Sequence, residues 1–524
     1  MSGGITKPVI SGVVSTVKPG IVDKVKVKTA RTKFDFVAAD STVTFTDIRG
    51  TAAVGGDVRG GGKILIGDDR IGRKTQVNFN FRTGNAPGDS FANIYNIPTG
   101  SFQVGNVAAT ANLSGTPETL RTLVKFNAPK ATYPATGEVI VNREGDSEAE
   151  RSLSFRDVAL AVAGGTALAS GSWNQQRWQV VANTKGIKIN QFVSKEQLEK
   201  INLDSANFNG KIIVSGNSTP FKIAKIRTEN ANIGVAGGTV AVNSVKFDEN
   251  KFSADLVASG VQVGRLLKDS SLPVNGPLSG RFQVSGNTDN FDTKNLSIQG
   301  DASLATAGGR ITANNIKVKD GIYLARVRAN NVGLQQLSQQ IPKSFKGKLN
   351  GEFDVAGSVD SFQPESIVAT GKGEIKTAGG VITANNIQVK DGVYLGQVGV
   401  NNVRVRDLSE QVPKSFKGRL TGKFNLAGSL DSFAPESLIV SGQANLNTAV
   451  GKISASDIEF ARGQYRAKVG VNNIDVRQLS PQVPQSFPGK LTGIFNIAGS
   501  TKSVEDLTVS GNASINAAGG KISA

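Results

Sequence analysis

The chain has no cysteine and no histidine, and only one methionine and two tryptophans among its 524 residues. Without cysteine there can be no disulfide, thiolate nucleophile or zinc–thiolate site. Without histidine the chain lacks the most common general base and the most common metal ligand. No catalytic constellation stands out among the remaining residues. We therefore expect a protein that is not an enzyme, with no catalytic residue, no metal and no cofactor.

Hydrophobic residues are also scarce, at 38% of the chain, whereas glycine is abundant, with 61 residues. Globular chains usually contain roughly 45–50% apolar residues, so this composition suits sheets that are apolar on one face only. No apolar run reaches the ~18–20 residues of a membrane-spanning helix. The opening MSGGITKPVI has no signal-peptide core, and both ends look cut, so we expect a fragment of a longer chain.

The formal charge is +18, but the basic residues are spread evenly and form no run of five or six. We interpret them as a solvated basic exterior and predict no nucleic-acid partner. The stretch VRGGGKILIG, from Val58 to Gly67, superficially looks like a phosphate loop. Ile64 stands where such a loop needs serine or threonine, so we interpret the stretch as a glycine-rich turn.

A long internal repeat dominates the second half of the chain. GKLNGEFDVAGSVDSF, GRLTGKFNLAGSLDSF and GKLTGIFNIAGSTKSV begin at residues 347, 418 and 489, a step of 71. A glycine recurs at the same step, at Gly280, Gly351, Gly422 and Gly493, with weaker copies around Gly210 and Gly137. A period this regular indicates a repeat array. We predict degenerate β repeats over 1–136, diverged repeats of about 70–73 residues over 137–279, and strict repeats over 280–524, with units near 280–350, 351–421, 422–492 and a truncated 493–524.

Within a repeat, apolar and polar residues alternate, which predicts strands with one dry and one wet face. The pair Asn385-Asn386 interrupts the alternation and predicts a β-bulge. The triplet Lys390 to Gly392, KDG, predicts a hairpin turn. Each unit therefore has about four antiparallel strands. The segment from Leu334 to Phe345 breaks the pattern, and is either a structural plug across a sheet end or a mobile gate over a groove.

The dry faces of successive units must be covered, because a long exposed apolar band would aggregate. A second sheet, a filled β-helix or an open trough with apolar guests could each do so. Small residues at inward positions leave room for guests such as acyl chains, although glycine also permits strong sheet curvature. We predict an all-β, elongated array of antiparallel strands curled into an open trough. The predicted groove-lining residues are Leu296, Ile298, Leu349, Gly351, Phe353, Val355, Ile367, Ala369, Ile375, Tyr394, Val398, Val400, Leu420, Gly422, Phe424, Leu426, Leu438, Val440, Leu491, Phe495 and Ile497.

The strings SGRFQVSGN, NGEFDVAGSVDSF, TGKFNLAGSLDSF and TGIFNIAGSTKSV resemble the repeats of TamB-like proteins, in the AsmA-like superfamily. The resemblance covers about residues 210–524 and is greatest to cyanobacterial members, kin to a chloroplast inner-envelope translocon component of plants. It implies a β-taco whose apolar groove conducts phospholipid.

The resemblance also implies a periplasmic location within the cell envelope, with an inner-membrane anchor and an Omp85-type outer-membrane partner, both through regions missing here. The expected function is a non-enzymatic bridge that passes phospholipid acyl chains between the two membranes and supports outer-membrane biogenesis, protein assembly or secretion. A secreted or surface β-helix adhesin with a filled core is the alternative.

Overall fold

A computed structural model shows an all-β chain that divides into two compact units. The first unit is Met1–Glu199, Leu203–Val235 and Val240–Asp255, and the second is Lys200–Asn202, Ala236–Thr239 and Leu256–Ala524. The structure describes residues 8–22, 24–95, 97, 102–145, 151–248, 250–266, 276–287, 293–306, 308–334, 346–361, 364–377, 379–408, 417–430, 432, 434–449, 451–478, 489–517 and 519–524.

The first unit is an antiparallel sheet in which every strand from β3 to β13 pairs with the next strand in the sequence, while β1 and β2 also pair with β3. Its strands are β1 (Val9–Ser15), β2 (Gly20–Val22), β3 (Val25–Val37), β4 (Thr42–Ala52), β5 (Asp57–Leu65), β6 (Gln76–Pro87), β7 (Asn106–Gly115), β8 (Thr119–Ala128), β9 (Ala135–Glu144), β10 (Arg151–Val162), β11 (Gly165–Asn174), β12 (Arg177–Lys188), β13 (Asn207–Ser218) and β14 (Phe221–Val235). Strands β15 (Gly238–Asp248) and β16 (Lys251–Gln262) each have residues in both units.

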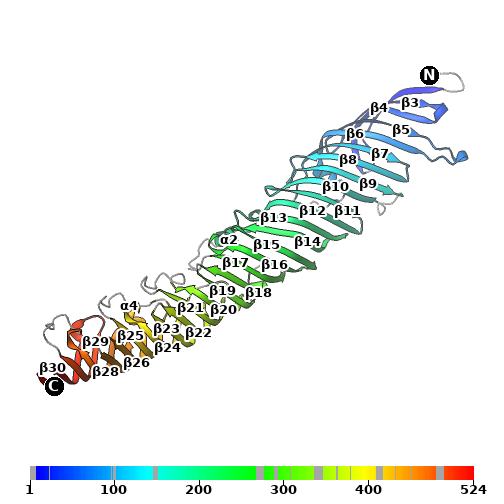
Figure 1. Cartoon of the computed structure of the whole chain (residues 1–524). Coiled ribbons are helices and arrows are strands. Elements are labelled where there is room, and N and C mark those ends of the chain that lie inside the picture. Colours follow the sequence, from blue (N-terminus) through cyan, green and yellow to red (C-terminus); the bar gives the residue numbers. More distant parts are fainter. Residues whose placement is uncertain are drawn as a thin grey trace. The chain divides into compact units, whose positions relative to one another are not determined.

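The second unit continues the same architecture with strands that lie side by side in sequence order (Figure 1). They are β17 (Pro277–Asn287), β18 (Ser297–Thr306), β19 (Gly309–Lys319), β20 (Ile322–Gly333), β21 (Gly347–Ser358), β22 (Val368–Thr377), β23 (Gly380–Lys390), β24 (Val393–Arg404), β25 (Gly418–Ser429), β26 (Ile439–Thr448), β27 (Gly451–Ala461), β28 (Gln464–Asp475), β29 (Lys490–Ser500), β30 (Thr508–Ala517) and β31 (Gly520–Ser523). In the described residues of this unit, strands pair only with their sequence neighbours, so the sheet is open.

In the part of the chain that the structure describes, helical structure is limited to short turns between strands. The α-helical turns are α1 (Gly88–Ile94), α2 (Lys195–Lys200), α3 (Val263–Leu266) and α4 (Val405–Leu408). The 3-10 turns are η1 (Ala38–Asp40), η2 (Asp69–Ile71), η4 (Ile189–Phe192), η5 (Thr293–Asn295), η7 (Pro364–Ser366), η8 (Pro435–Ser437), η9 (Val476–Gln478) and η10 (Val504–Asp506). Most of the Leu334 to Phe345 segment and of its two later copies lies outside the described residues, so both interpretations of it stay predictions.

Each strict repeat has four strands, as the alternation predicts, and β21 to β24 form one such unit. The predicted KDG hairpin is confirmed, because Lys390 pairs with Val393 and leaves a two-residue turn. Both turn residues, Asp391 and Gly392, have positive φ angles of 50° and 74°. This left-handed pair matches the strand twist of a tight hairpin, which is why aspartate–glycine is favoured here.

The predicted bulge is confirmed as well, since the register between β23 and β24 shifts between Asn385 and Gln388. Asn386 has a φ of 52°, and its equivalents Asn315 and Asp457 have 54° and 53°. Bulges bend a strand and increase its twist. These bulges recur at the same point of every repeat. They therefore bend successive strands at the same place, and the sheet as a whole curls there.

The core is small and lies beside a second column of bulges. Val332, Val403 and Ile474, one per repeat, are 0–2% exposed and are the largest fully buried side chains of the described chain. Each follows an asparagine in the left-handed conformation and lies opposite a leucine near the start of the next unit's first strand. Among the described residues no aromatic side chain is buried. The predicted fold class, an all-β antiparallel array that forms an open curled trough, is confirmed.

Candidate functional site

Strand register brings the predicted groove residues of the second unit onto one face of its sheet. Directly paired residues in antiparallel strands point to the same side. Leu349 lies opposite Ile375, and Val355 lies opposite Ala369. The same relation continues from β24 to β25, where Val398 lies opposite Phe424. We call this side the apolar face.

All predicted groove residues lie on strands of this face except three, which come just before β18, β22 and β26, namely Leu296, Ile367 and Leu438. Every member of the set is half-buried, apart from Val400, which is buried at 8% exposure. Their side chains thus contact neighbours on the face, but the described part of the chain does not cover them. That they contact lipid stays a prediction.

Aromatic rings fill the space above the glycines of the apolar face, which the sequence did not lead us to expect. A Cβ atom at Gly371 would lie 2.6 Å from Cδ1 of Phe353, and one at Gly351 would lie 2.8 Å from Cε2 of the same ring. Phe424 covers Gly422 in the same manner, at 2.9 Å. The prediction that Gly351 and Gly422 leave space for a guest is therefore wrong. The phenylalanine rings lie over the glycines, where any larger residue would clash with them. The apolar surface is therefore formed by ring faces and aliphatic side chains.

Tyrosines use the same arrangement at the hairpin end of each repeat. Tyr394 lies opposite Gly428, and a Cβ there would lie 2.5 Å from its hydroxyl oxygen. Tyr323 covers Gly357 identically. Burial raises the pKa of both tyrosines above the ordinary value, because it disfavours the phenolate. Each repeat therefore places a tyrosine ring on the apolar face at the same position, next to its hairpin turn.

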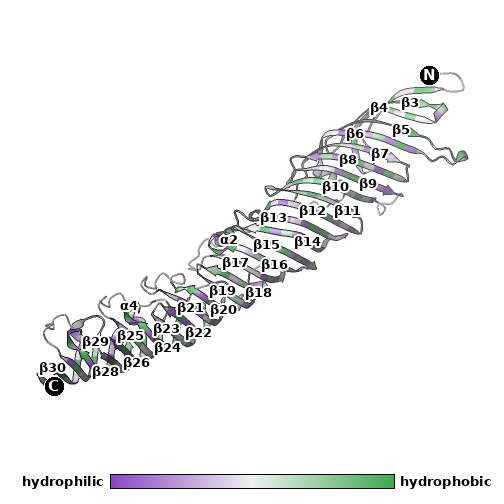
Figure 2. Ribbon diagram, viewed as in Figure 1, coloured by the Kyte–Doolittle hydropathy of each residue, from purple (hydrophilic) through white to green (hydrophobic). Residues whose placement is uncertain are grey.

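The opposite side of the sheet carries charged and polar residues, and Figure 2 shows hydrophobic and hydrophilic residues alternating along the strands. On this polar face, cross-strand ion pairs join residues of opposite sign, such as Arg326 with Asp354 at 2.9 Å and Lys211 with Glu229 at 2.7 Å. Such exposed pairs contribute little energy, about 0.2–1 kcal/mol each. Their main consequence is a wettable exterior behind the apolar face.

The first unit has an apolar face too, although the sequence interpretation named no groove residue there. Phe45 and Phe79 have ring centroids 5.7 Å apart, and Phe79 and Phe81 are stacked at 5.8 Å. These rings cover Gly60 and Gly62, where added Cβ atoms would lie 2.6 and 2.4 Å from ring carbons. Glycines 60 to 62 thus lie within strand β5, and the interpretation of this stretch as a turn is wrong. Alternation of phenylalanine with polar residues in β6, QVNFNFRT, was the signal that could have identified this face.

No three acidic side chains among the described residues come close enough to one another to hold a metal ion. Within the same residues, no helix is both long and apolar enough to span a membrane.

Comparison with known proteins identifies no relative. No protein-family model, curated protein or solved structure matches the chain significantly.

Proposed function

We propose that the apolar face binds hydrocarbon chains of phospholipids and lets them pass along the sheet, in a protein that is not an enzyme. The observation that carries this proposal is the half-burial of every groove residue except Val400, together with the absence of buried aromatic rings in the described chain. Apolar area removed from water contributes roughly 25 cal/mol per Å², so an acyl chain gains free energy by covering this face.

The repeat supports passage rather than binding at one point. Phe353 and Phe424 occupy equivalent positions 71 residues apart, as do Tyr394 and Tyr323. A guest that moves by one repeat meets the same side chains again. Equivalent sites have equal affinity, so no single site becomes a trap for the guest.

The biological setting is part of the proposal and rests on the resemblance to TamB-like repeats. In this setting the chain belongs to a periplasmic bridge, anchored in the inner membrane and associated with an Omp85-type outer-membrane protein through other regions. It carries phospholipid between the two membranes and supports outer-membrane biogenesis, protein assembly or secretion. The alternative, a β-helix adhesin with a filled core, is not favoured by the antiparallel pairing and the uncovered rings.

Photo-crosslinking tests the proposal with a matched pair of positions on one strand. Benzoylphenylalanine replaces Phe424 on the apolar face, or Lys423 on the polar face, in the chain expressed in bacteria. After irradiation, mass spectrometry should find phospholipid adducts at Phe424 and not at Lys423. Equal labelling of both positions, or no lipid adduct at either, contradicts the proposal.

A charge substitution gives an independent measure. Leu426→Glu places a carboxylate on the apolar face, whereas Asn425→Glu places one on the polar face of the same strand. Organic extracts of the purified Leu426→Glu variant should contain several-fold less phospholipid than those of the parent. The Asn425→Glu variant should retain the parent's lipid content, and matching circular dichroism spectra confirm that both variants are folded.

A further inference from the structure

Four consecutive strands of the first unit place arginines directly opposite one another on the polar face. Arg31 of β3 pairs with Arg49 of β4, which pairs with Arg59 of β5, which pairs with Arg82 of β6. All four side chains are exposed. We call them the arginine row. Adjacent strands lie about 4.8 Å apart, so the backbone positions that carry these four arginines follow one another at that spacing.

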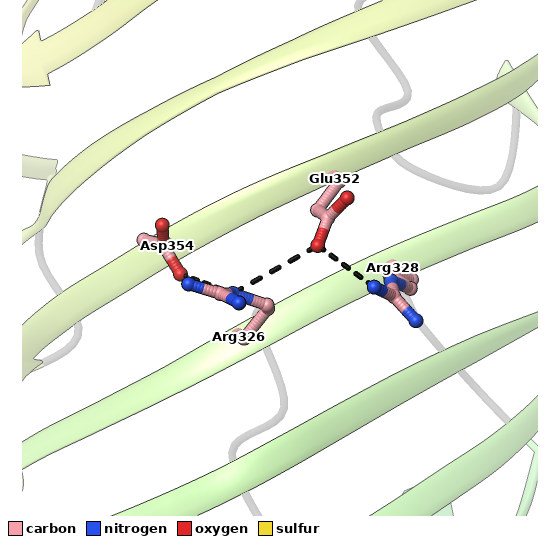
Figure 3. A network of polar contacts seen from close by, with 4 residues as sticks. All are labelled: Arg326, Arg328, Glu352 and Asp354. Carbon is pink, nitrogen blue, oxygen red and sulfur yellow. Dashed lines mark hydrogen bonds and ion pairs between the residues drawn. The ribbon is translucent and has the colours of Figure 1, made fainter.

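Like charges directly opposite one another destabilise a sheet. In the second unit, by contrast, two neighbouring arginines of β20 each lie opposite an acidic residue of β21. Figure 3 shows Arg326 bound to Asp354 at 2.9 Å and Arg328 bound to Glu352 at 3.0 Å across neighbouring strands. The arginine row has no such arrangement. Its only ion pair within the described chain joins Arg49 to Asp47 at 2.8 Å. Excess positive charge is therefore concentrated on this part of the sheet.

The row borders a hollow of about 610 Å³ on the first unit. Gly61 lies on the polar face between rows of longer side chains, and a Cβ there would meet only Phe45 O, at 3.1 Å. Asn112 donates a hydrogen bond from Nδ2 to Oδ1 of Asn80 at 2.8 Å beside it. Lys125 closes the far side, paired with Glu138 at 2.9 Å. The hollow is thus within the range of about 300–1,000 Å³ found for small-ligand sites.

We propose that this hollow binds an anionic ligand that carries at least two phosphate groups, held by Arg49, Arg59 and Arg82. The planar guanidinium fork matches phosphate oxygens in a bidentate manner. Arginines on successive strands can each take a different phosphate, which compensates the like-charge repulsion within the row. The ligand is either a phosphorylated lipid headgroup or a soluble polyphosphate compound, and both offer the same chemistry.

Nucleic acid is less well suited to this surface. Single strands bind through base stacking on aromatic side chains as well as through phosphate contacts. The phenylalanines of β4 and β6, Phe45, Phe79 and Phe81, occupy alternate positions and lie on the apolar face. Around the arginine row, the described side chains of β4 to β6 on the polar face thus offer charge without an aromatic stacking partner. The inference does not depend on the proposed lipid groove, because the two lie on opposite faces.

Titration with defined probes tests the inference on the full chain. The probes are inorganic tripolyphosphate, phosphatidylcholine vesicles with and without 20% cardiolipin, whose headgroup carries two phosphates, and a 12-nucleotide single strand, in low and moderate salt. Arg59→Gln with Arg82→Gln removes two members of the row. Arg326→Gln with Arg328→Gln removes the same charge from the second unit, where both residues are already ion-paired.

We expect the parent chain to bind tripolyphosphate or the acidic vesicles, and the Arg59/Arg82 double variant to bind at least tenfold more weakly. The Arg326/Arg328 variant should stay within twofold of the parent. Binding of tripolyphosphate alone identifies a soluble ligand, and binding of acidic vesicles alone identifies a headgroup.

Three outcomes overturn the inference: no binding of either phosphate probe at low salt, equal losses in the two double variants, or tighter binding of the oligonucleotide that depends on the row. Because all substituted side chains are exposed, circular dichroism and thermal melting should be unchanged in both variants. A single Arg82→Gln variant, with an intermediate loss of affinity, keeps the test valid if the double variant does not fold.

Discussion

Truncation of one buried valine to alanine should make local unfolding of a single repeat more frequent and leave the rest of the chain folded. Val403 is 0% exposed, whereas Val393, on the same strand β24, is 48% exposed. Val403→Ala deletes two buried carbons at about 0.8 kcal/mol each, and the cavity adds to this, for a total of about 1.6–3 kcal/mol. That free energy corresponds to an increase of about 15- to 150-fold in the population of the locally open state.

Hydrogen exchange with mass spectrometry is the suitable assay, because a repeat array need not unfold as one cooperative unit. Peptides from β24 and β25 should exchange faster by that factor in Val403→Ala, while peptides from the first unit keep the parent's rates. Val393→Ala is the matched control and should change exchange by less than about twofold, since exposed substitutions usually alter stability by under about 0.5 kcal/mol. Val332→Ala, in the equivalent position of the preceding repeat, should act on β20 and β21 instead. Similar effects of Val403→Ala and Val393→Ala would refute the assignment of this valine as the anchor of its repeat.

Two further substitutions test the packing of aromatic rings over glycines and the contribution of an ion pair. Gly428→Ala places a Cβ 2.5 Å from the hydroxyl of Tyr394 and should destabilise the repeat by about 1–3 kcal/mol. Gly396→Ala, whose Cβ would have its nearest atom at 3.6 Å, is the control and should change hydrogen exchange little. Equal effects of the two substitutions would contradict the packing of Tyr394 over Gly428. A hydrogen bond from Arg477 lowers the pKa of Asp475, so the stability that this carboxylate contributes is present above its unfolded pKa of about 3.9 and is lost as pH falls through the folded value. Asp475→Asn should therefore lower the melting temperature at pH 7, and the difference from the parent should shrink as the pH falls below about 4; a difference that is the same at pH 7 and at pH 2 would refute the pairing.

Much of the local structure could be predicted from short stretches of sequence. Asp391-Gly392 forms its tight turn because two left-handed residues in succession favour aspartate and glycine. Asn386 forms its bulge because asparagine tolerates the left-handed conformation better than other non-glycine residues. These are properties of one or two residues, so they can be recognised without knowledge of the fold.

Other features depend on partners that are distant in the sequence. Small residues at inward positions looked like open space, but Gly371 lies opposite Phe353 of the neighbouring strand, and the ring fills that space. Glycines 60 to 62 looked like a turn, although phenylalanines of the neighbouring strand allow them to remain in a strand. In both cases the error has the same physical origin, because a glycine's role is decided by what the adjacent strand places above it.

The amino-acid sequence by itself determined the strands, their turns and the two-sided character of the sheet, since alternation and turn propensity act between near neighbours. Tertiary structure alone decided which side chains meet across strands. Arg31, Arg49, Arg59 and Arg82 are separated by stretches of different length and show no period in the sequence, yet strand register aligns them in one row. Register is a non-local property, set by all the pairs of two strands together, and a single stretch of sequence does not contain it.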